Sequence, residues 1–127
     1  MSALILDADA LIAIDRGDRQ VLAQVEDADR AGDPVRTNAM AVAQVWRDGK
    51  GRQARLARAL RDITVESITR EDGMRAGELL GATRMKDAID ASVALLAGPG
   101  DRVLTSDAQD LRALCDAAGA NAVVVDC

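Results

Sequence analysis

Five short apolar segments alternate with longer helical segments along this chain, and this alternation constrains the fold more than any other feature of the sequence. Each apolar segment has the length and composition of a buried strand. They are residues 3–6, 35–37, 63–65, 102–105 and 122–125. Strands that alternate with helices form parallel sheets, because parallel neighbours need a long crossover connection. The sequence therefore predicts an α/β fold in which helices cover both faces of a parallel sheet of about five strands.

Helix-capping residues predict where several helices begin. Asp18 is suited to cap a helix over residues 19–30, and Asn38 is suited to cap the next one. Thr69, with Asp72 three residues later, resembles a capping box. Each of these residues can accept a hydrogen bond from an otherwise unpaired N–H group of a first helical turn.

The last two predicted helices cover residues 86–97, ending before Gly98-Pro99-Gly100, and residues 108–118, ending at Gly119. No linker, repeat or low-complexity segment divides the 127 residues. This length suits one domain of ordinary size, so we expect a single domain over residues 1–127. No segment approaches the roughly 20 apolar residues of a membrane helix, and we expect a soluble, cytoplasmic protein.

The composition excludes several kinds of chemistry. The chain has no histidine, so imidazole cannot act as a general base, and its two cysteines cannot form a four-ligand zinc site. Phe and Tyr are absent and Trp46 is the only aromatic residue, so base stacking cannot be the main mode of nucleic-acid recognition. Any hydrolytic reaction would have to use carboxylates and metal-activated water.

Three aspartates stand where the predicted elements can bring carboxylates together. Asp7 and Asp107 each follow directly after a predicted strand. Ligands of parallel sheets bind beyond the carboxyl ends of the strands, where the strand order reverses, so these two residues face one crevice if the first and fourth strands are neighbours. Asp90 lies in a helical segment of otherwise apolar residues, where a solvated aspartate is less expected. The three residues form a candidate catalytic site for Mg²⁺ or Mn²⁺, because clustered carboxylates repel each other unless a cation neutralises them.

Each carboxylate also has a purely structural interpretation. Asp7 and Asp107 are of a residue type that caps helices, and a helix is expected directly after each. Asp87 lies three residues before Asp90, which places the two side chains roughly 5–6 Å apart on one helix face. A carboxylate at position 87 is also favoured by the helix dipole alone. The sequence leaves both interpretations open.

Positive charge is concentrated in one segment of an otherwise acidic chain with a formal net charge of −5. The basic residues of this segment are Arg47, Lys50, Arg52, Arg55, Arg58 and Arg61. They suit contacts with the phosphates of a nucleic acid, and Arg47, Arg52 and Arg55 are the candidate RNA-binding residues. The alternative is a solvated helix face, since the arginines spread around about half of the helix circumference.

Four segments together resemble a known family. They are Leu6–Ile12, Ala43–Arg47, Asp87–Ala91 and Leu104–Leu111. The chain resembles a PIN domain over nearly its whole length, and most closely the VapC toxins of bacterial toxin–antitoxin pairs. The resemblance implies the strand order 3-2-1-4-5, a homodimer, a VapB-like antitoxin partner and Mg²⁺-dependent cleavage of RNA. It also implies that Asp7, Asp90 and Asp107 hold the metal directly or through water.

Two positions depart from the pattern of that family. Gln44 stands where the family usually has glutamate, and Asp9 stands where it more often has a small hydroxyl or amide residue. We expect either weakened metal binding or a metal site that recruits Asp9, Asp87 and Asp110. Two alternatives to an active ribonuclease stay open: a PIN-like binding protein without catalysis, and an aspartate-nucleophile phosphatase of the haloacid dehalogenase type, which the Asp7-x-Asp9 pattern also resembles.

Overall fold

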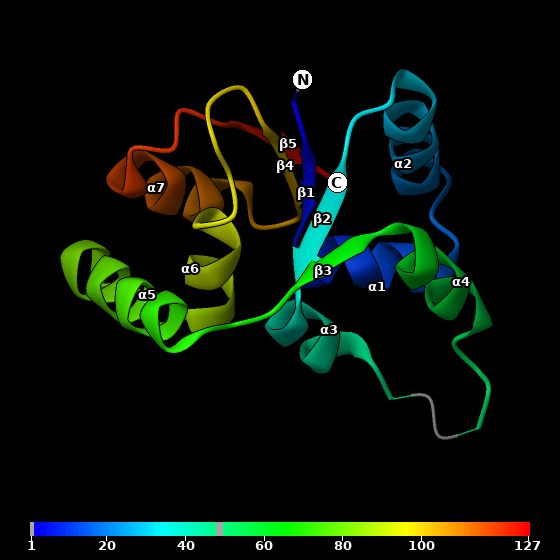
Figure 1. Cartoon of the computed structure of the whole chain (residues 1–127), viewed down its shortest axis with the longest axis horizontal. Coiled ribbons are helices and arrows are strands. Elements are labelled where there is room, and N and C mark those ends of the chain that lie inside the picture. Colours follow the sequence, from blue (N-terminus) through cyan, green and yellow to red (C-terminus); the bar gives the residue numbers. More distant parts are fainter. Residues whose placement is uncertain (1, 48–49) are drawn as a thin grey trace.

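Five parallel strands form one sheet in the order β3-β2-β1-β4-β5 in the computed structural model, which describes residues 2–47 and 50–127 (Figure 1). The strands are β1 (Leu4–Leu6), β2 (Val35–Asn38), β3 (Thr64–Glu66), β4 (Arg102–Thr105) and β5 (Val123–Asp126). Leu4 of β1 is in register with Val35 of β2 on one side and with Arg102 of β4 on the other. The predicted α/β class and strand order are confirmed, and the first and fourth strands are neighbours.

Seven helices in the described residues cover the two faces of this sheet. They are α1 (Ala8–Arg16), α2 (Arg19–Ala31), α3 (Ala39–Val45), α4 (Ala54–Asp62), α5 (Arg70–Thr83), α6 (Ala88–Ala94) and α7 (Ala108–Ala118). Helices α1, α2 and α4 lie on one side of the strands and α5, α6 and α7 on the other (Figure 1). Helix α3 contacts both α1 and α6, so it lies where the two layers meet beyond the end of β1.

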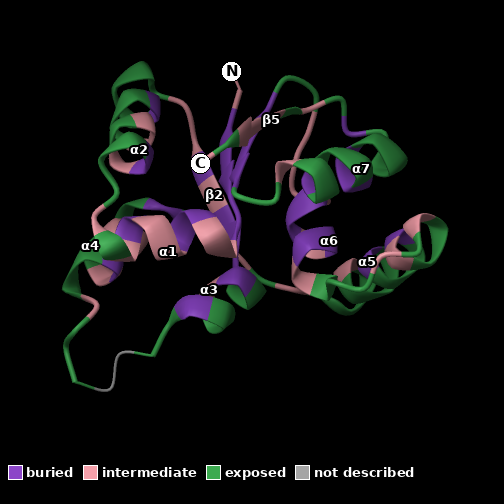
Figure 2. Ribbon diagram, turned by 180° about the vertical axis from the view of Figure 1, so that it is seen from behind, coloured by how far each residue is buried: buried purple, intermediate pink, exposed green. Residues whose placement is uncertain are grey.

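The core lies between the sheet and the inner sides of these helices (Figure 2). All three residues of β1 are fully buried, as expected for the central strand of a parallel sheet. Their neighbours from the helices include Leu11, Leu56 and Leu111, each with no exposed surface. None of the described helices is both long enough and apolar enough to cross a membrane.

The predicted N-caps are confirmed. The Asp18 side chain accepts hydrogen bonds from the N–H groups at the start of α2, and the Asn38 side chain does the same for α3. Thr69 and Asp72 form a reciprocal capping box at the start of α5. The bonds of Asn38 fix the point at which the chain leaves β2 and enters α3, and so help to determine where Gln44 lies.

Helix α6 is shorter than predicted, because it covers Ala88–Ala94 and not residues 86–97. At its start, Asp87 is the N-cap and accepts a hydrogen bond from the Asp90 N–H at 2.9 Å. At its end, the N–H groups of Leu96 and Ala97 bond three residues back, to Val93 and Ala94, so the α-helical pattern stops there. Lys86 therefore lies outside the helix, in the segment that leads into it.

Candidate active site

Asp7 is delivered to the end of the sheet by β1 and caps helix α1 with only one of its two oxygens. Its Oδ1 accepts a hydrogen bond from the Ala10 N–H at 2.9 Å. The side chain is buried, with 1% of the residue exposed, and Oδ2 has no hydrogen-bond partner among the described residues. The cap interpretation thus accounts for half of this carboxylate and leaves the other half unexplained.

A second buried aspartate shows what a purely structural carboxylate looks like in this fold. Asp101 is also largely buried, yet its Oδ1 accepts from the Ala3 N–H and its Oδ2 from the Gly98 N–H, both at 2.8 Å. Native structures rarely leave a buried polar atom unpaired, because doing so forfeits its hydration without replacement. The unpaired Oδ2 of Asp7 is therefore the atom in this structure that most clearly calls for a ligand.

Helix α6 brings two carboxylates to the same end of the sheet. Asp90 lies in its first turn and is 9% exposed, whereas the N-cap Asp87 is exposed. The structural alternative for Asp87 was a carboxylate favoured by the helix dipole; in the structure it is the N-cap of α6, and its Oδ1 accepts a hydrogen bond from the Asp90 N–H. A hydrogen bond from Asn38 Nδ2 to Ser92 Oγ at 2.9 Å joins the start of α3 to α6 and holds these two elements of the site together.

Asp107 follows β4 and precedes α7, but its side chain makes no capping hydrogen bond. The structural alternative for this residue is therefore wrong: its N–H donates to Thr105 Oγ1, and its exposed carboxylate is not used by the helix. Asp110, one turn further on, is exposed as well and does not line the pocket described below. The two residues form a matched pair, because both are exposed aspartates at the same end of α7.

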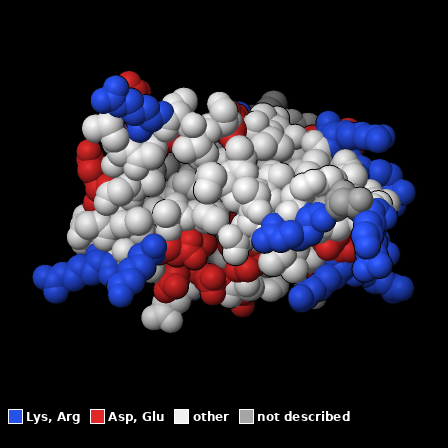
Figure 3. Space-filling view, turned by 90° about the horizontal axis from the view of Figure 1, so that it is seen from below, with Lys and Arg blue, Asp and Glu red and all other residues white. Residues whose placement is uncertain are grey.

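A pocket of about 400 Å³ is lined by five of the predicted site residues, Asp9, Gln44, Asp87, Asp90 and Asp107. Its lining comes from α1, α3, the start of α6 and the residue before α7, and consists of Ala8, Asp9, Ile12, Gln44, Lys86, Asp87, Ala88, Ile89, Asp90 and Asp107. Asp7 lies behind this lining and is not part of it. Acidic side chains gather on the corresponding face, with Lys and Arg on both sides of them (Figure 3). The predicted convergence of strand-end and helix carboxylates is therefore present.

Mutual repulsion and burial act on these carboxylates in the same direction. Burial raises the pKa of Asp7 to about 6, against the lowering effects of the nearby Thr105 hydroxyl, which makes no hydrogen bond to Oδ2, and of the Ala10 N–H. Burial, followed by the charges of Asp87 and then Asp7, raises the pKa of Asp90 to about 7. The pKa of Asp107 is also raised, by desolvation first and then by the charge of Asp9. The negative charges of the carboxylates thus repel one another, and a cation would relieve this repulsion.

The fit of the site to a divalent cation is partial. The donors are carboxylate oxygens, which Mg²⁺ and Mn²⁺ prefer, and Asp7 Oδ2 is unpaired. Within residues 2–47 and 50–127, however, no three acidic, histidine or cysteine side chains converge tightly enough to form a complete ligand set. Mg²⁺ usually keeps several waters and uses one or two protein carboxylates, so this arrangement suits an ion that is held partly through water.

The predicted RNA-binding arginines lie beside this pocket and not in it. The Arg47 guanidinium donates to the backbone oxygens of Ala43 and Trp46, and the Arg55 guanidinium donates to the backbone oxygen of Asp15. Arg52, which precedes α4, is exposed. Lys86 is the pocket residue that the sequence analysis missed, because position 86 was expected to be part of an apolar helix.

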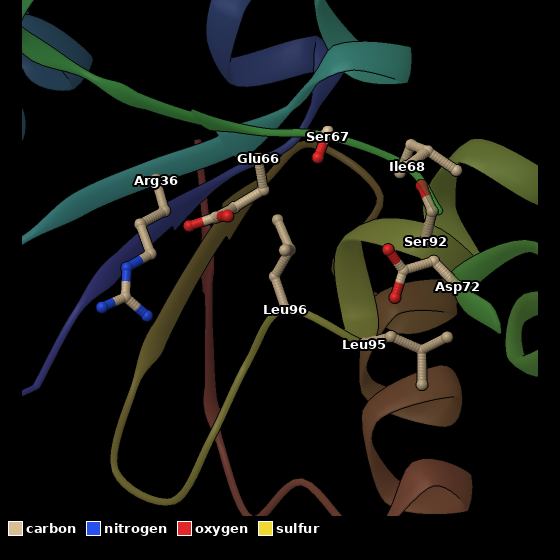
Figure 4. Close-up of a pocket in the computed structure, with 8 residues that line it drawn as sticks. All are labelled: Arg36, Glu66, Ser67, Ile68, Asp72, Ser92, Leu95 and Leu96. Carbon is tan, nitrogen blue, oxygen red and sulfur yellow. The ribbon is translucent and has the colours of Figure 1, made fainter. Parts of the chain in front are cut away.

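A smaller pocket of about 230 Å³ lies between the β2–β3 edge and α6. Arg36, Glu66, Asp72, Leu95 and Leu96 are among its lining residues, and the Glu66 carboxylate points toward the Arg36 side of the pocket (Figure 4). None of the predicted site residues lines it. The acidic pocket is thus the one that carries the candidate chemistry.

Comparison with solved structures gives the fold a counterpart. A chain from the crystal structure of VapBC2 from Rickettsia felis, bound to a DNA fragment from their promoter, matches with a TM-score of 0.70. The match covers 100% of this chain and 99% of that chain, at 13% sequence identity. No family model matches the sequence, and neither does any curated protein. The chain has a PIN-like fold of the VapC type, as the sequence predicted.

Proposed function

We propose that this protein is a Mg²⁺- or Mn²⁺-dependent endoribonuclease that acts as the toxin of a VapBC-type pair. The observation that carries the proposal is the unpaired, buried Oδ2 of Asp7 behind a pocket lined by the carboxylates of Asp9, Asp87, Asp90 and Asp107. The PIN-like fold supports it, since the matched solved structure is a VapBC complex. RNA in the cytoplasm is the proposed substrate.

In this proposal Asp7, Asp90 and Asp107 hold the cation, directly or through water. A bound divalent cation supplies neutralisation of the carboxylates, polarisation of the phosphoryl oxygen and activation of the attacking water. The hydrogen bond that Oδ1 accepts from the Ala10 N–H fixes the orientation of the Asp7 carboxylate. Because the chain has no histidine, a carboxylate of the pocket must accept any proton released by the attacking water.

The proposed partners follow from the charges and the exposed apolar side chains around the pocket. The arginines at positions 47, 52 and 55 are proposed to contact RNA phosphates beside the pocket. A VapB-like antitoxin is the proposed inhibitor. An arginine of such a partner suits the acidic pocket, because a guanidinium can take the place of a divalent cation among the carboxylates. We also propose a homodimer. Helix α3 exposes Met40, and Trp46 at its end is exposed too, which supports a contact with another chain on this side.

Replacing Asp107 with asparagine is the first test of this function. Asp107→Asn is expected to lower RNA cleavage at least about 10-fold, within the range seen when a group supporting a metal site is lost. It should not lower the unfolding temperature, because the side chain is exposed and makes no capping bond. The matched control is Asp110→Asn, because Asp110 is also an exposed aspartate but lies outside the pocket. Cleavage of a labelled RNA is measured with Mg²⁺, with Mn²⁺ and with EDTA.

Four outcomes of this assay and of a parallel assay with a small phosphate ester are informative. Loss of cleavage in Asp107→Asn but not in Asp110→Asn supports the proposal. Equal cleavage by wild type and Asp107→Asn contradicts the assigned site. No metal-dependent cleavage by wild type, with Asp7→Asn as the reference for background, favours the binding protein without catalysis. Hydrolysis of a small phosphate ester that Asp9→Asn abolishes, without RNA cleavage, favours the phosphatase alternative.

Gln44 provides a second prediction, on metal affinity. It lines the pocket from α3 and is exposed, so a glutamate there places one more carboxylate toward the ion without disturbing the core. Gln44→Glu is expected to tighten Mn²⁺ binding about 10-fold, by analogy with the effect of groups that support metal ligands. Calorimetric titration of wild type and Gln44→Glu with Mn²⁺ measures this. Equal affinities would show that Gln44 does not limit binding.

A further inference from the structure

We propose that Lys86 is the residue of the acidic pocket that binds the phosphate of the substrate and positions it against the carboxylates. This inference rests on the proposed ribonuclease function and names a substrate contact within that site. Lys86 is not one of the carboxylates that are proposed to hold the cation.

Lys86 is the cationic residue of the pocket lining. The other charged residues that line the pocket are Asp9, Asp87, Asp90 and Asp107, and the described lining contains no arginine. Lys86 lies in the short segment between α5 and α6, directly before the N-cap of α6. The N-cap bond from Asp90 N–H to Asp87 Oδ1 fixes the backbone at this point, so the lysine extends from a well-defined position at the rim.

The ammonium group of Lys86 has no ion-pair partner in the described part of the chain. The salt bridges there join Arg30 to Glu26, Arg30 to Asp27, and Arg102 to Asp33. A lysine that lines a pocket with four carboxylates yet pairs with none of them is available to an incoming anion. Lys86 is also exposed, so its charge has not been desolvated and its flexible stem can follow a ligand.

RNA entering this pocket needs a positive charge beyond the metal. A phosphodiester carries one negative charge, and the carboxylates around it repel that charge until cations offset them. The arginines at positions 47, 52 and 55 do not line the pocket, so they contribute general attraction to the RNA backbone and not a contact at the reacting phosphate. Lys86 is placed to make that contact, as a point charge on a mobile stem.

The test measures RNA binding under conditions that separate binding from cleavage. A short fluorescent single-stranded RNA is titrated with protein in Ca²⁺ and in EDTA, and anisotropy is followed at several salt concentrations. The variants are Lys86→Met, which keeps the aliphatic stem, and Lys86→Arg, which keeps the charge. The matched control is Arg84→Met, because Arg84 is an exposed cation two residues away that does not line the pocket.

Lys86→Met is expected to weaken RNA binding about 5- to 10-fold and to reduce the slope of log affinity against log salt by about 0.7, the value for one lost phosphate contact on a single strand. Lys86→Arg should retain most of the affinity and the full slope, and Arg84→Met should change neither. A merely structural role of Lys86 would not alter the salt slope. In the cleavage assay, Lys86→Met should raise KM more than it lowers kcat.

Two results overturn the proposal in distinguishable ways. If wild type cleaves RNA and Lys86→Met binds it with unchanged affinity and salt slope, the role of Lys86 is wrong and the ribonuclease function stands. If wild type neither binds nor cleaves RNA, the ribonuclease function fails and this inference fails with it. A loss of affinity that Lys86→Arg does not restore also counts against a charge contact.

Discussion

An Asp7→Asn variant is expected to lose RNA cleavage by at least about 100-fold and yet to unfold at a higher temperature than wild type. The catalytic loss follows because the buried Asp7 Oδ2 has no hydrogen-bond partner among the described residues and Asp7 is proposed to hold the cation, so its loss should cost at least as much as the loss of a supporting group. The gain in stability follows because neutral asparagine can keep the cap bond to the Ala10 N–H without burying a charge.

The size of that gain can be bounded from the pKa of Asp7. Its rise from 3.8 to about 6 corresponds to an upper limit of about 3 kcal/mol of destabilisation at neutral pH. Urea denaturation in EDTA at pH 7.5 measures the difference. Asp18→Asn is the control, since Asp18 is also an N-cap but is exposed and outside the pocket. An Asp7→Asn protein that cleaves RNA normally, or that is less stable than wild type by several kcal/mol, contradicts this account.

The metal-free protein is expected to become less stable as the pH rises from about 5 to 8. Asp7 and Asp90 both have folded-state pKa values above their ordinary value of 3.8, at about 6 and about 7. The folded protein therefore binds more protons than the unfolded chain between these values, and its free energy of unfolding falls with increasing pH. The stabilisation by protons is complete below pH 3.8 and is lost as the pH passes through 6 and 7.

Divalent cations should reverse this trend at the upper end of the range. Mg²⁺ or Mn²⁺ should bind the ionised carboxylates of the folded protein, so the free energy of unfolding at pH 8 should rise with cation concentration. The measurement is urea denaturation at pH 5, 6, 7 and 8, in EDTA and in 5-fold steps of Mn²⁺. The double variant Asp7→Asn with Asp90→Asn should lose most of the pH dependence. A metal-free protein whose stability is flat or increases over this range would show that these carboxylates are not strained by burial.

The fold was predictable because its signals are local or follow from simple pattern. Capping residues such as Asp18, Asn38 and Thr69 act through hydrogen bonds to N–H groups within three residues, so the sequence alone locates them. The alternation of apolar strands and helices determines the parallel class. The strand order needed more, since pairing β1 with β4 is a contact between distant segments, and the resemblance to PIN domains provided it.

The site was predictable only in outline, because its details depend on packing. The sequence placed Asp7 and Asp107 after strands, but not that Asp7 is buried with one oxygen unpaired while Asp107 is exposed and caps nothing. The bounds of α6 were predicted wrongly. Residues 88–97 are apolar apart from Asp90 and Ser92, so the helix was extended too far, and Asp87 was not recognised as the N-cap at which it begins. Lys86, which lines the pocket and precedes the helix, was therefore not recognised as a site residue.

The central position of β1 has a consequence for how the protein is made. This strand is synthesised well before its neighbour β4, which lies almost a hundred residues later and brings Asp107 with it. A growing chain that ends after β3 therefore has one side of Leu4–Leu6 unpaired, and Asp7 lacks the carboxylates of α6 and of the turn before α7. For the toxin proposed above this order of assembly is a safeguard, because no fragment that ends before Asp107 contains the complete candidate site while it is still being translated.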